Sequence, residues 1–173
     1  MTHTAASPSL IRRFACLAYE SLLMAAILLL VSAFYTPLKA WAGQSFWLEQ
    51  AFRAVLAGAL FAYFGTSWVT RGQTVAMKAW RIQVETTDGR RLDWPHAAMR
   101  YLISLAVFVL VPVLAYVGTR DSYGHRPVVA LAAFSWCILP FLCTLIDPDK
   151  RALHDRLAGT RMTLVAKTLK TRP

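Results

Sequence analysis

The sequence predicts an all-α membrane protein with four transmembrane helices and a small cytoplasmic β-hairpin or amphipathic segment. Hydrophobic residues make up 57% of the 173 residues and charged residues only 16%, whereas soluble domains carry about a quarter of charged residues. Four apolar runs are at least 18 residues long, which is enough to cross a bilayer as a helix. The lysines and arginines gather between and after these runs.

The first predicted span covers residues 14–35 and follows Arg12 and Arg13. At a rise of about 1.5 Å per residue, a run of about 22 residues extends about 33 Å, close to the thickness of the hydrocarbon core. A secretory signal peptide is the alternative, but its apolar region would have only about 7–15 residues. The length of the run and the three spans after it favour a retained transmembrane helix.

The other three spans are predicted at residues 51–70, 101–118 and 127–146. Arg53 lies near the start of the second span, where a long side chain can reach the headgroups. Pro112 lies inside the third span and Pro140 inside the fourth. Each proline removes a helical hydrogen bond, so we expect a bend at each.

The distribution of basic residues predicts the orientation. Fifteen of the 19 lysines and arginines lie in the N-terminal segment 1–13, the loop 71–100 and the tail 147–173. The other four lie on the opposite side of the membrane domain 14–146: Lys39, Arg53, Arg120 and Arg126. By the positive-inside rule, the basic side is cytoplasmic, which predicts a multi-pass protein of the bacterial inner membrane with both termini inside.

Aromatic residues support these boundaries. Trp41, Trp47, Trp68 and Tyr101 lie near the ends of predicted spans. Tryptophan and tyrosine are enriched at this depth because their rings are apolar and carry one polar group. We therefore expect these four side chains to lie in aromatic belts at the membrane surfaces.

The loop 71–100 carries a strand-and-turn pattern. Residues 81–85 alternate polar and apolar side chains before Asp88 and Gly89, which predicts a strand and a tight turn, with 90–94 as the returning strand. Asp93 suits the start of the third helix. In the tail, residues 150–158 have helical character and 160–165 alternate like a strand. A two-stranded hairpin is marginal alone, so we expect it to rest on the membrane face or on this tail strand.

Glu20 is the only acidic residue well inside an apolar run. A charge at the bilayer centre costs about 3 kcal/mol or more, so its carboxyl group should be protonated, paired or directed at a polar cavity. Arg13 lies seven residues earlier, on nearly the same helix face. Two interpretations remain open: a site for an ion or small solute, and an interhelical anchor with no ligand.

Further polar residues are expected at the depth of Glu20. They would complete a polar pocket around it: Tyr63, Thr66, Ser67, Ser104 and Thr144. The cytoplasmic rim of this pocket would consist of Arg100, Asp147, Asp149 and Arg151.

Other chemistry is not predicted. The histidines (His3, His96, His125, His154) share no ligand spacing, and the cysteines (Cys16, Cys137, Cys143) lie inside apolar runs as small packing residues. Signatures such as Gly-x-Ser-x-Gly and His-Glu-x-x-His are absent, so we expect neither an enzyme nor a cofactor or metal. His154 and Asp155 are adjacent and should point apart at the surface.

The basic segments predict contact with anionic lipid headgroups. Lys167, Lys170 and Arg172 extend the tail, and each can contribute about 1 kcal/mol of attraction to such a surface. No recognition helix or RNA-binding motif accompanies the positive charge, so nucleic acid is not an expected partner.

Three segments together resemble the RDD family of membrane proteins, which is named for one arginine and two aspartates. Arg13 and Glu20 stand where the family has its arginine and first acid, although that acid is usually aspartate. The segment 72–84 is similar to the family's loop after the second span, with Gly72, Thr74 and Lys78 at motif positions and Ala76 where glycine is frequent. The segment 153–161 is similar to its last motif, with Asp155 as the second acid.

The resemblance implies a role in transport, since some members look like cation/proton exchangers and most have no assigned function. The leading hypothesis is movement of an ion or small solute by a homo-oligomer, with proton-coupled cation exchange as its sharpest form. Glu20 would bind the proton or cation and Arg13 would tune it. The alternatives are a non-catalytic scaffold or accessory subunit acting through the cytoplasmic loop and tail, and, third, a membrane enzyme.

Overall fold

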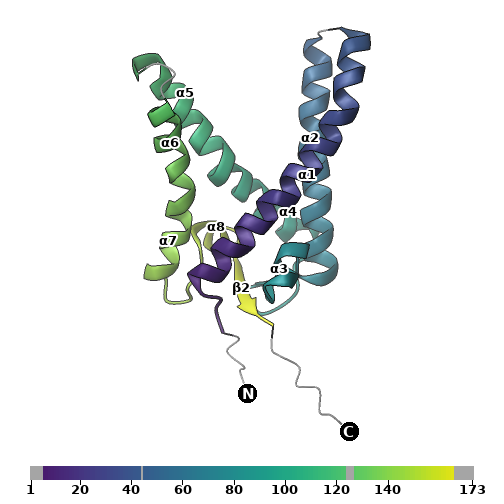
Figure 1. Ribbon diagram of the computed structural model, residues 1–173. Coiled ribbons are helices and arrows are strands. Elements are labelled where there is room, and N and C mark those ends of the chain that lie inside the picture. Colours follow the sequence, from purple (N-terminus) through teal and green to yellow (C-terminus); the bar gives the residue numbers. More distant parts are fainter. Residues whose placement is uncertain (1–5, 44, 124–126, 166–173) are drawn as a thin grey trace.

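Two helical hairpins diverge from a common base (Figure 1). The computed structural model describes residues 6–43, 45–123 and 127–165. One hairpin consists of α1 (Leu10–Ala42) and α2 (Phe46–Arg71), the other of α5 (Val111–Tyr123) and α6 (Pro127–Ser135). The base contains the short helices α3 (Val75–Ala79) and α8 (Leu153–Leu157) and the strands β1 (Ile82–Thr86) and β2 (Thr160–Leu164). Both ends of the chain leave the molecule at this base.

Four segments among the described residues are helical, long and apolar enough to cross a membrane: Leu10–Ala42, Phe46–Arg71, Trp94–Thr119 and Pro127–Ile146. Each contains one predicted span, so the prediction of a four-span, mostly helical membrane protein is confirmed. The first three are longer than predicted. Their helices continue past the apolar run because capping groups, rather than the loss of hydrophobicity, end them.

Local capping explains where the third span begins. The Asp93 side chain accepts a hydrogen bond from the His96 backbone N–H at 3.0 Å, and Pro95 occupies the first turn, where its missing N–H costs no helical bond. Helix α4 (Trp94–Leu105) therefore starts in the base and continues toward the membrane, as the sequence predicts.

Irregular helical turns lie just ahead of the two prolines at which the sequence predicts bends. The π-helical turn η1 (Ala106–Leu110) precedes Pro112, and the 3-10 turn η2 (Trp136–Ile138) precedes Pro140. A proline leaves a carbonyl of the preceding turn without its helical donor. In η1, two carbonyls accept from side chains of η2: Phe108, four residues before Pro112, from Cys137 Sγ at 3.7 Å, and Val107 from Trp136 Nε1 at 3.2 Å.

The strand pairing differs from the predicted hairpin. β1 pairs with β2 from the tail in an antiparallel register, with Ile82 opposite Leu164 and Thr86 opposite Thr160. Residues 90–93 form no strand, so the prediction of a returning strand at 90–94 is wrong. The Arg90 carbonyl instead accepts from the Thr86 N–H at 2.9 Å, which closes a short turn and releases the chain toward α4.

Both outer edges of the sheet are covered. The Val84 N–H donates to the Gly72 carbonyl at 2.8 Å, and the Leu164 N–H donates to the Ala6 carbonyl at 2.9 Å. The second bond links the N-terminal segment directly to the tail strand. A two-stranded sheet is marginal alone and would otherwise expose unpaired backbone groups at both edges. These bonds therefore stabilise the sheet within the base.

The buried core lies in the base rather than between the hairpins. It is formed by Cys16, Trp68, Ala76, Met77, Ile82, Val84, Leu92 and Ala97. Many large apolar side chains elsewhere on the four spans are exposed, as expected for a surface in contact with lipid. Trp41 and Trp47 lie exposed at the far end of the α1–α2 hairpin. Trp68 does not join such a belt, because it is 4% exposed and belongs to the core.

Candidate functional site

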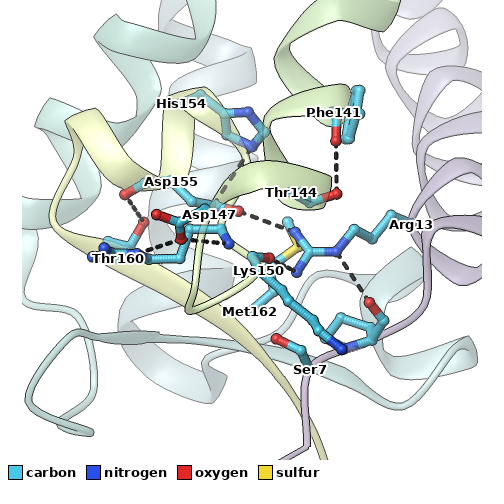
Figure 2. A network of polar contacts seen from close by, with 12 residues as sticks. Ser7, Arg13, Phe141, Thr144, Asp147, Lys150, His154, Asp155, Thr160 and Met162 are labelled. Carbon is cyan, nitrogen blue, oxygen red and sulfur yellow. Dashed lines mark hydrogen bonds and ion pairs between the residues drawn. The ribbon is translucent and has the colours of Figure 1, made fainter.

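Asp155 draws three helices together in the base. Its Oδ2 lies 3.4 Å from Nη1 of Arg13 on α1, and its Oδ1 accepts from Nη1 of Arg100 on α4. The side chains of all three residues are at most 2% exposed. Figure 2 shows how the aspartate of α8 meets the arginine of α1 beneath the end of the fourth span.

Both arginines have further partners. Arg13 donates to the carbonyl of Lys150 at 2.7 Å and to that of Pro8 at 3.3 Å. Arg100 donates to the Thr160 hydroxyl, and its guanidinium carbon lies 5.1 Å from the centre of the Trp68 ring. The expectation that Arg100 forms a solvent-facing rim is therefore wrong. Its neighbours on α8 and β2 come from the tail, so the sequence of α4 alone does not reveal them.

The electrostatics of this cluster favour an ionised aspartate. Burial raises the pKa of Asp155, but the nearby Arg100 and Arg13 guanidinium groups outweigh burial and hold that pKa below its ordinary value. Burial lowers the pKa of His154 to about 4, so its ring is neutral at physiological pH. Two guanidinium groups and one carboxylate then leave the cluster with an excess positive charge.

His154 and Asp155 do not lie at the surface as the sequence suggests. The Nε2 of His154 lies 3.6 Å from Oδ1 of Asp155, and both side chains are buried. The ring of His154 contacts those of Phe108 and Phe141 from the third and fourth spans. This placement differs from the prediction because α8 is covered on more than one side, whereas a short helix after a membrane span usually lies on the surface.

Glu20 lies in a second polar centre on α1. Its side chain is buried, and its Oε2 accepts from the Thr74 hydroxyl at 2.5 Å. Thr74 precedes α3 and also accepts from the Met77 N–H at 3.2 Å, so one hydroxyl both caps α3 and binds the carboxyl group. This contact joins the first span to the loop after the second. At about 1.5 Å per residue, the seven residues between Arg13 and Glu20 separate the two centres by about 10 Å.

One oxygen of the Glu20 carboxyl group is buried without a hydrogen bond of ordinary geometry among the described residues. Glu20 Oε1 and the neighbouring Tyr63 hydroxyl are both buried, and the geometry between them falls short of a full hydrogen bond. The two groups are close enough to interact electrostatically. No ion pair within the described parts of the chain involves Glu20, and Arg13 is directed at Asp155 instead.

No hydrogen bond among the described residues joins the remaining pocket candidates to Glu20. Thr66 donates to the carbonyl of Ala62 and Thr144 to that of Phe141, so both hydroxyls bond within their own helices. Ser67 on α2 and Ser104 on α4 are half-buried, and no hydrogen bond joins either to Glu20 in the described structure. Of the predicted pocket, only Tyr63 accompanies the carboxyl group.

Three of the predicted rim residues, Asp147, Asp149 and Arg151, form an ion-pair cluster that is separate from Glu20. Asp147 Oδ2 accepts from the backbone N–H of Arg151 at 2.9 Å and from its Nε at 3.1 Å. Hydrogen bonding by that backbone N–H, followed by the Arg151 side chain, lowers the pKa of Asp147. Asp149 lies 3.1 Å from Nη2 of Arg151. These residues lie at the end of the fourth span.

Gly72 and Lys78 of the loop motif contribute to the structure through their backbone rather than through their side chains. Gly72 ends α2 with a φ of 69°, a left-handed conformation that favours glycine. Lys78 is exposed on α3, and its carbonyl accepts from the Arg81 N–H at 3.2 Å. Thr74 is the exception because its side chain reaches Glu20. The sequence marks Thr74 only through the family pattern.

Some expected features lie outside the described residues. These are His3 and His125 and the tail residues Lys167, Lys170 and Arg172. Within the described residues, no group of three or more histidine, cysteine, aspartate or glutamate side chains could hold a metal ion.

Comparison with known proteins adds one finding. A sequence model of the RDD family matches residues 7–159, which include both polar centres, the loop after the second span and α8. No curated protein and no solved structure matches the chain.

Proposed function

The chain belongs to the RDD family, and we propose that it moves an ion or small solute across the membrane, in its sharpest form by proton-coupled cation exchange. The environment of Glu20 carries this proposal. An acidic side chain within a transmembrane segment is expensive and is commonly part of an ion or proton path. Glu20 has no cationic partner among the described residues, and its buried Oε1 faces only the neighbouring Tyr63 hydroxyl, without a full hydrogen bond.

The donor set around Glu20 suits a proton or a hard cation. The Glu20 carboxyl group, the Thr74 hydroxyl and the neighbouring Tyr63 hydroxyl offer only oxygen atoms, which hard cations prefer. A proton on Glu20 would remove the need for a counter-ion, and a bound cation would supply one. Exchange between these two occupants is the step that couples proton and cation movement.

Arg13 has a different part in this proposal from the one that the sequence suggests. It binds Asp155 and the backbone of the N-terminal and tail segments, and so holds the base in place beneath Glu20. It shares the Asp155 carboxylate with Arg100. The coupling group is then Glu20, with Thr74 and Tyr63 as its neighbours.

The setting of this activity is also proposed. The basic residues at the base favour a cytoplasmic base, and hence a bacterial inner-membrane protein with both termini inside. Exchange by a homo-oligomer is consistent with the exposed apolar faces of the spans, because four helices of this length enclose little space by themselves. Lipids with anionic headgroups are the expected surroundings.

Proteoliposomes test the proposal. The internal pH would be followed when sodium, potassium or lithium is added to vesicles with wild-type protein, Glu20→Gln or Glu20→Asp. Cation-dependent proton movement is expected in the wild type and in Glu20→Asp, because both have a carboxyl group. It is not expected in Glu20→Gln. Glu49→Gln is the matched control, because Glu49 pairs with Lys39 at 3.4 Å near the opposite end of the α1–α2 hairpin.

Two results would contradict the proposal. Wild-type protein that is folded and inserted but moves no protons with any of the three cations excludes this exchange. Equal movement in wild type and Glu20→Gln removes Glu20 from the path.

A scaffold or accessory role is the second candidate, and the buried ion cluster favours it. Asp155, Arg13 and Arg100 hold the sheet and α8 rigidly against the spans, as a docking platform would require. In that case Glu20→Gln would change stability alone. Substitutions of exposed basic residues on the base, such as Arg81, Arg90 or Arg156, would abolish the function instead.

A further inference from the structure

A cleft of about 280 Å³ opens at the end of the fourth span. Its charged wall contains Asp147 and Arg151 from the loop after α7 (Leu139–Ile146) and Arg156 from α8. Its apolar wall includes Ile146 and Leu153. Neither polar centre described above opens into this cleft, so it is a separate feature of the base.

The charges in the cleft are unequally matched. Arg151 pairs with Asp147 and Asp149, each at 3.1 Å, and the Asp147 carboxylate also accepts the Arg151 backbone N–H. Arg156 is exposed and has no ion pair among the described residues. The charge of Arg156 also helps to lower the pKa of Asp147, but its guanidinium group forms no ion pair with the described residues of the cleft and can still donate to an anion.

The apolar rim places this guanidinium at a membrane surface. Ile146 is 87% exposed and Leu145 69% exposed in the last turn of the span, and Leu157 beside Arg156 is 58% exposed. Hydrocarbon would cover these side chains in a bilayer. Lipid phosphates lie immediately outside the hydrocarbon. The cleft and Arg156 come directly after the end of the span, so they lie at the level of these phosphates.

We propose that this cleft binds one membrane phospholipid, with its phosphate on Arg156 and its acyl chains along the exposed side chains of Leu145 and Ile146. Arginine matches a phosphate because its planar group can donate two parallel charge-assisted hydrogen bonds. The Asp147–Arg151 pair forms the polar wall beside the headgroup. The lipid would cover the junction between α7 and α8, next to the helix that carries Asp155.

Lipid titration followed by native mass spectrometry tests this site. Delipidated full-length protein in detergent would be titrated with phosphatidylglycerol, and the first binding event would be compared between wild type, Arg156→Gln and Arg90→Gln. Arg90 is the matched control because its side chain is 79% exposed on a turn of the base, outside the cleft, and pairs with Asp88 at 3.1 Å. Arg156→Gln should weaken the first binding event about tenfold, in line with the loss of a charged hydrogen bond, and Arg90→Gln should leave it unchanged.

Thermal melting in lipid-free detergent would show that both variants are folded, since both substitutions are at the surface. Equal lipid affinity in wild type and Arg156→Gln would overturn the proposal, and so would an equal loss in both variants. Millimolar inorganic phosphate should not displace the lipid, because free phosphate lacks acyl chains. Displacement would show that the cleft takes a soluble anion and would also overturn it.

Discussion

At the scale of single residues, Asp155 has the most demanding environment. It is fully buried and provides the carboxylate that faces both Arg13 and Arg100. Taking an ion out of water is expensive, and a buried pair compensates only when each charge keeps its partners. Removing this carboxylate would leave two buried guanidinium groups without the negative charge that now offsets the cost of their burial.

We therefore expect Asp155→Asn to destabilise the protein strongly. Breaking a buried ion pair from one side costs about 3–5 kcal/mol, and here one residue serves two cations. Thermal melting in detergent would measure the loss. Asp149→Asn is the control, because that side chain is 67% exposed and pairs with Arg151 at the surface. A melting temperature for Asp155→Asn equal to that of wild type would contradict the importance of the cluster.

His154 predicts a pH dependence of stability. Burial lowers its pKa from 6.5 to about 4, and the charged groups that face it are Asp155, Arg100 and Arg13. Above pH 6.5 the ring is neutral in both states. As the pH falls from 6.5 toward 4, the unfolded chain binds a proton that the folded protein excludes, so stability falls.

Melting curves between pH 7 and pH 4 would measure this decline. It should be smaller in His154→Gln, even if that variant is less stable overall, because the slope and not the absolute stability reports the titrating ring. An unchanged slope in His154→Gln would assign the decline to another group.

At the scale of elements, the pairing of β1 with β2 organises the base. It joins the loop after the second span to the tail after the fourth, and the tail in turn bonds to the N-terminal segment. Glu85 on β1 and Arg161 on β2 lie opposite one another, with Nε 2.8 Å from Oε1. The predicted hairpin would instead have paired 81–85 with 90–94, with the tail strand as a further neighbour.

A double-mutant cycle on Glu85 and Arg161 would test this pairing. Each charge reversal alone, Glu85→Arg or Arg161→Glu, should lower the stability by about 0.5–1 kcal/mol, and the double reversal should recover most of the loss. Chemical denaturation would provide the free energies of unfolding. Arg91→Glu is the control, because Arg91 lies in the segment of the expected returning strand and donates to the Thr70 carbonyl. Coupling of Glu85 to Arg91 instead of Arg161 would support the local hairpin.

At the scale of the whole molecule, the described parts of the two hairpins diverge from the base, where the elements that join them lie (Figure 1). The Asp155 cluster lies where α1, α4 and α8 converge beside the sheet, and the Glu20 centre joins α1 to the start of α3. The far halves of the spans present apolar side chains outward. The base therefore determines how the spans are arranged, while lipid or other copies of the chain must cover their outer surfaces.

The proposed orientation predicts which side of the membrane each end of the molecule faces. In a background with Cys16, Cys137 and Cys143 replaced by serine or alanine, a cysteine at position 90 should react with a membrane-impermeant maleimide only in inside-out vesicles. A cysteine at position 47, which is 78% exposed as Trp47 at the far end of the first hairpin, should react from the opposite side. The reverse pattern would invert the topology, and labelling of both positions from one side would contradict the spans.

The sequence by itself determined the number and approximate place of the spans, the positions near Pro112 and Pro140 at which the helices become irregular, and the family pattern around Arg13 and Glu20. These features depend on neighbouring residues: a span needs only about 20 consecutive apolar side chains, and a proline acts on its own turn. Tertiary structure alone decided the partners. Arg13 meets Asp155 across 142 residues and Glu20 meets Thr74 across 54. Such contacts depend on how whole elements pack, because only packing brings distant side chains within the few ångströms over which hydrogen bonds and buried ion pairs act.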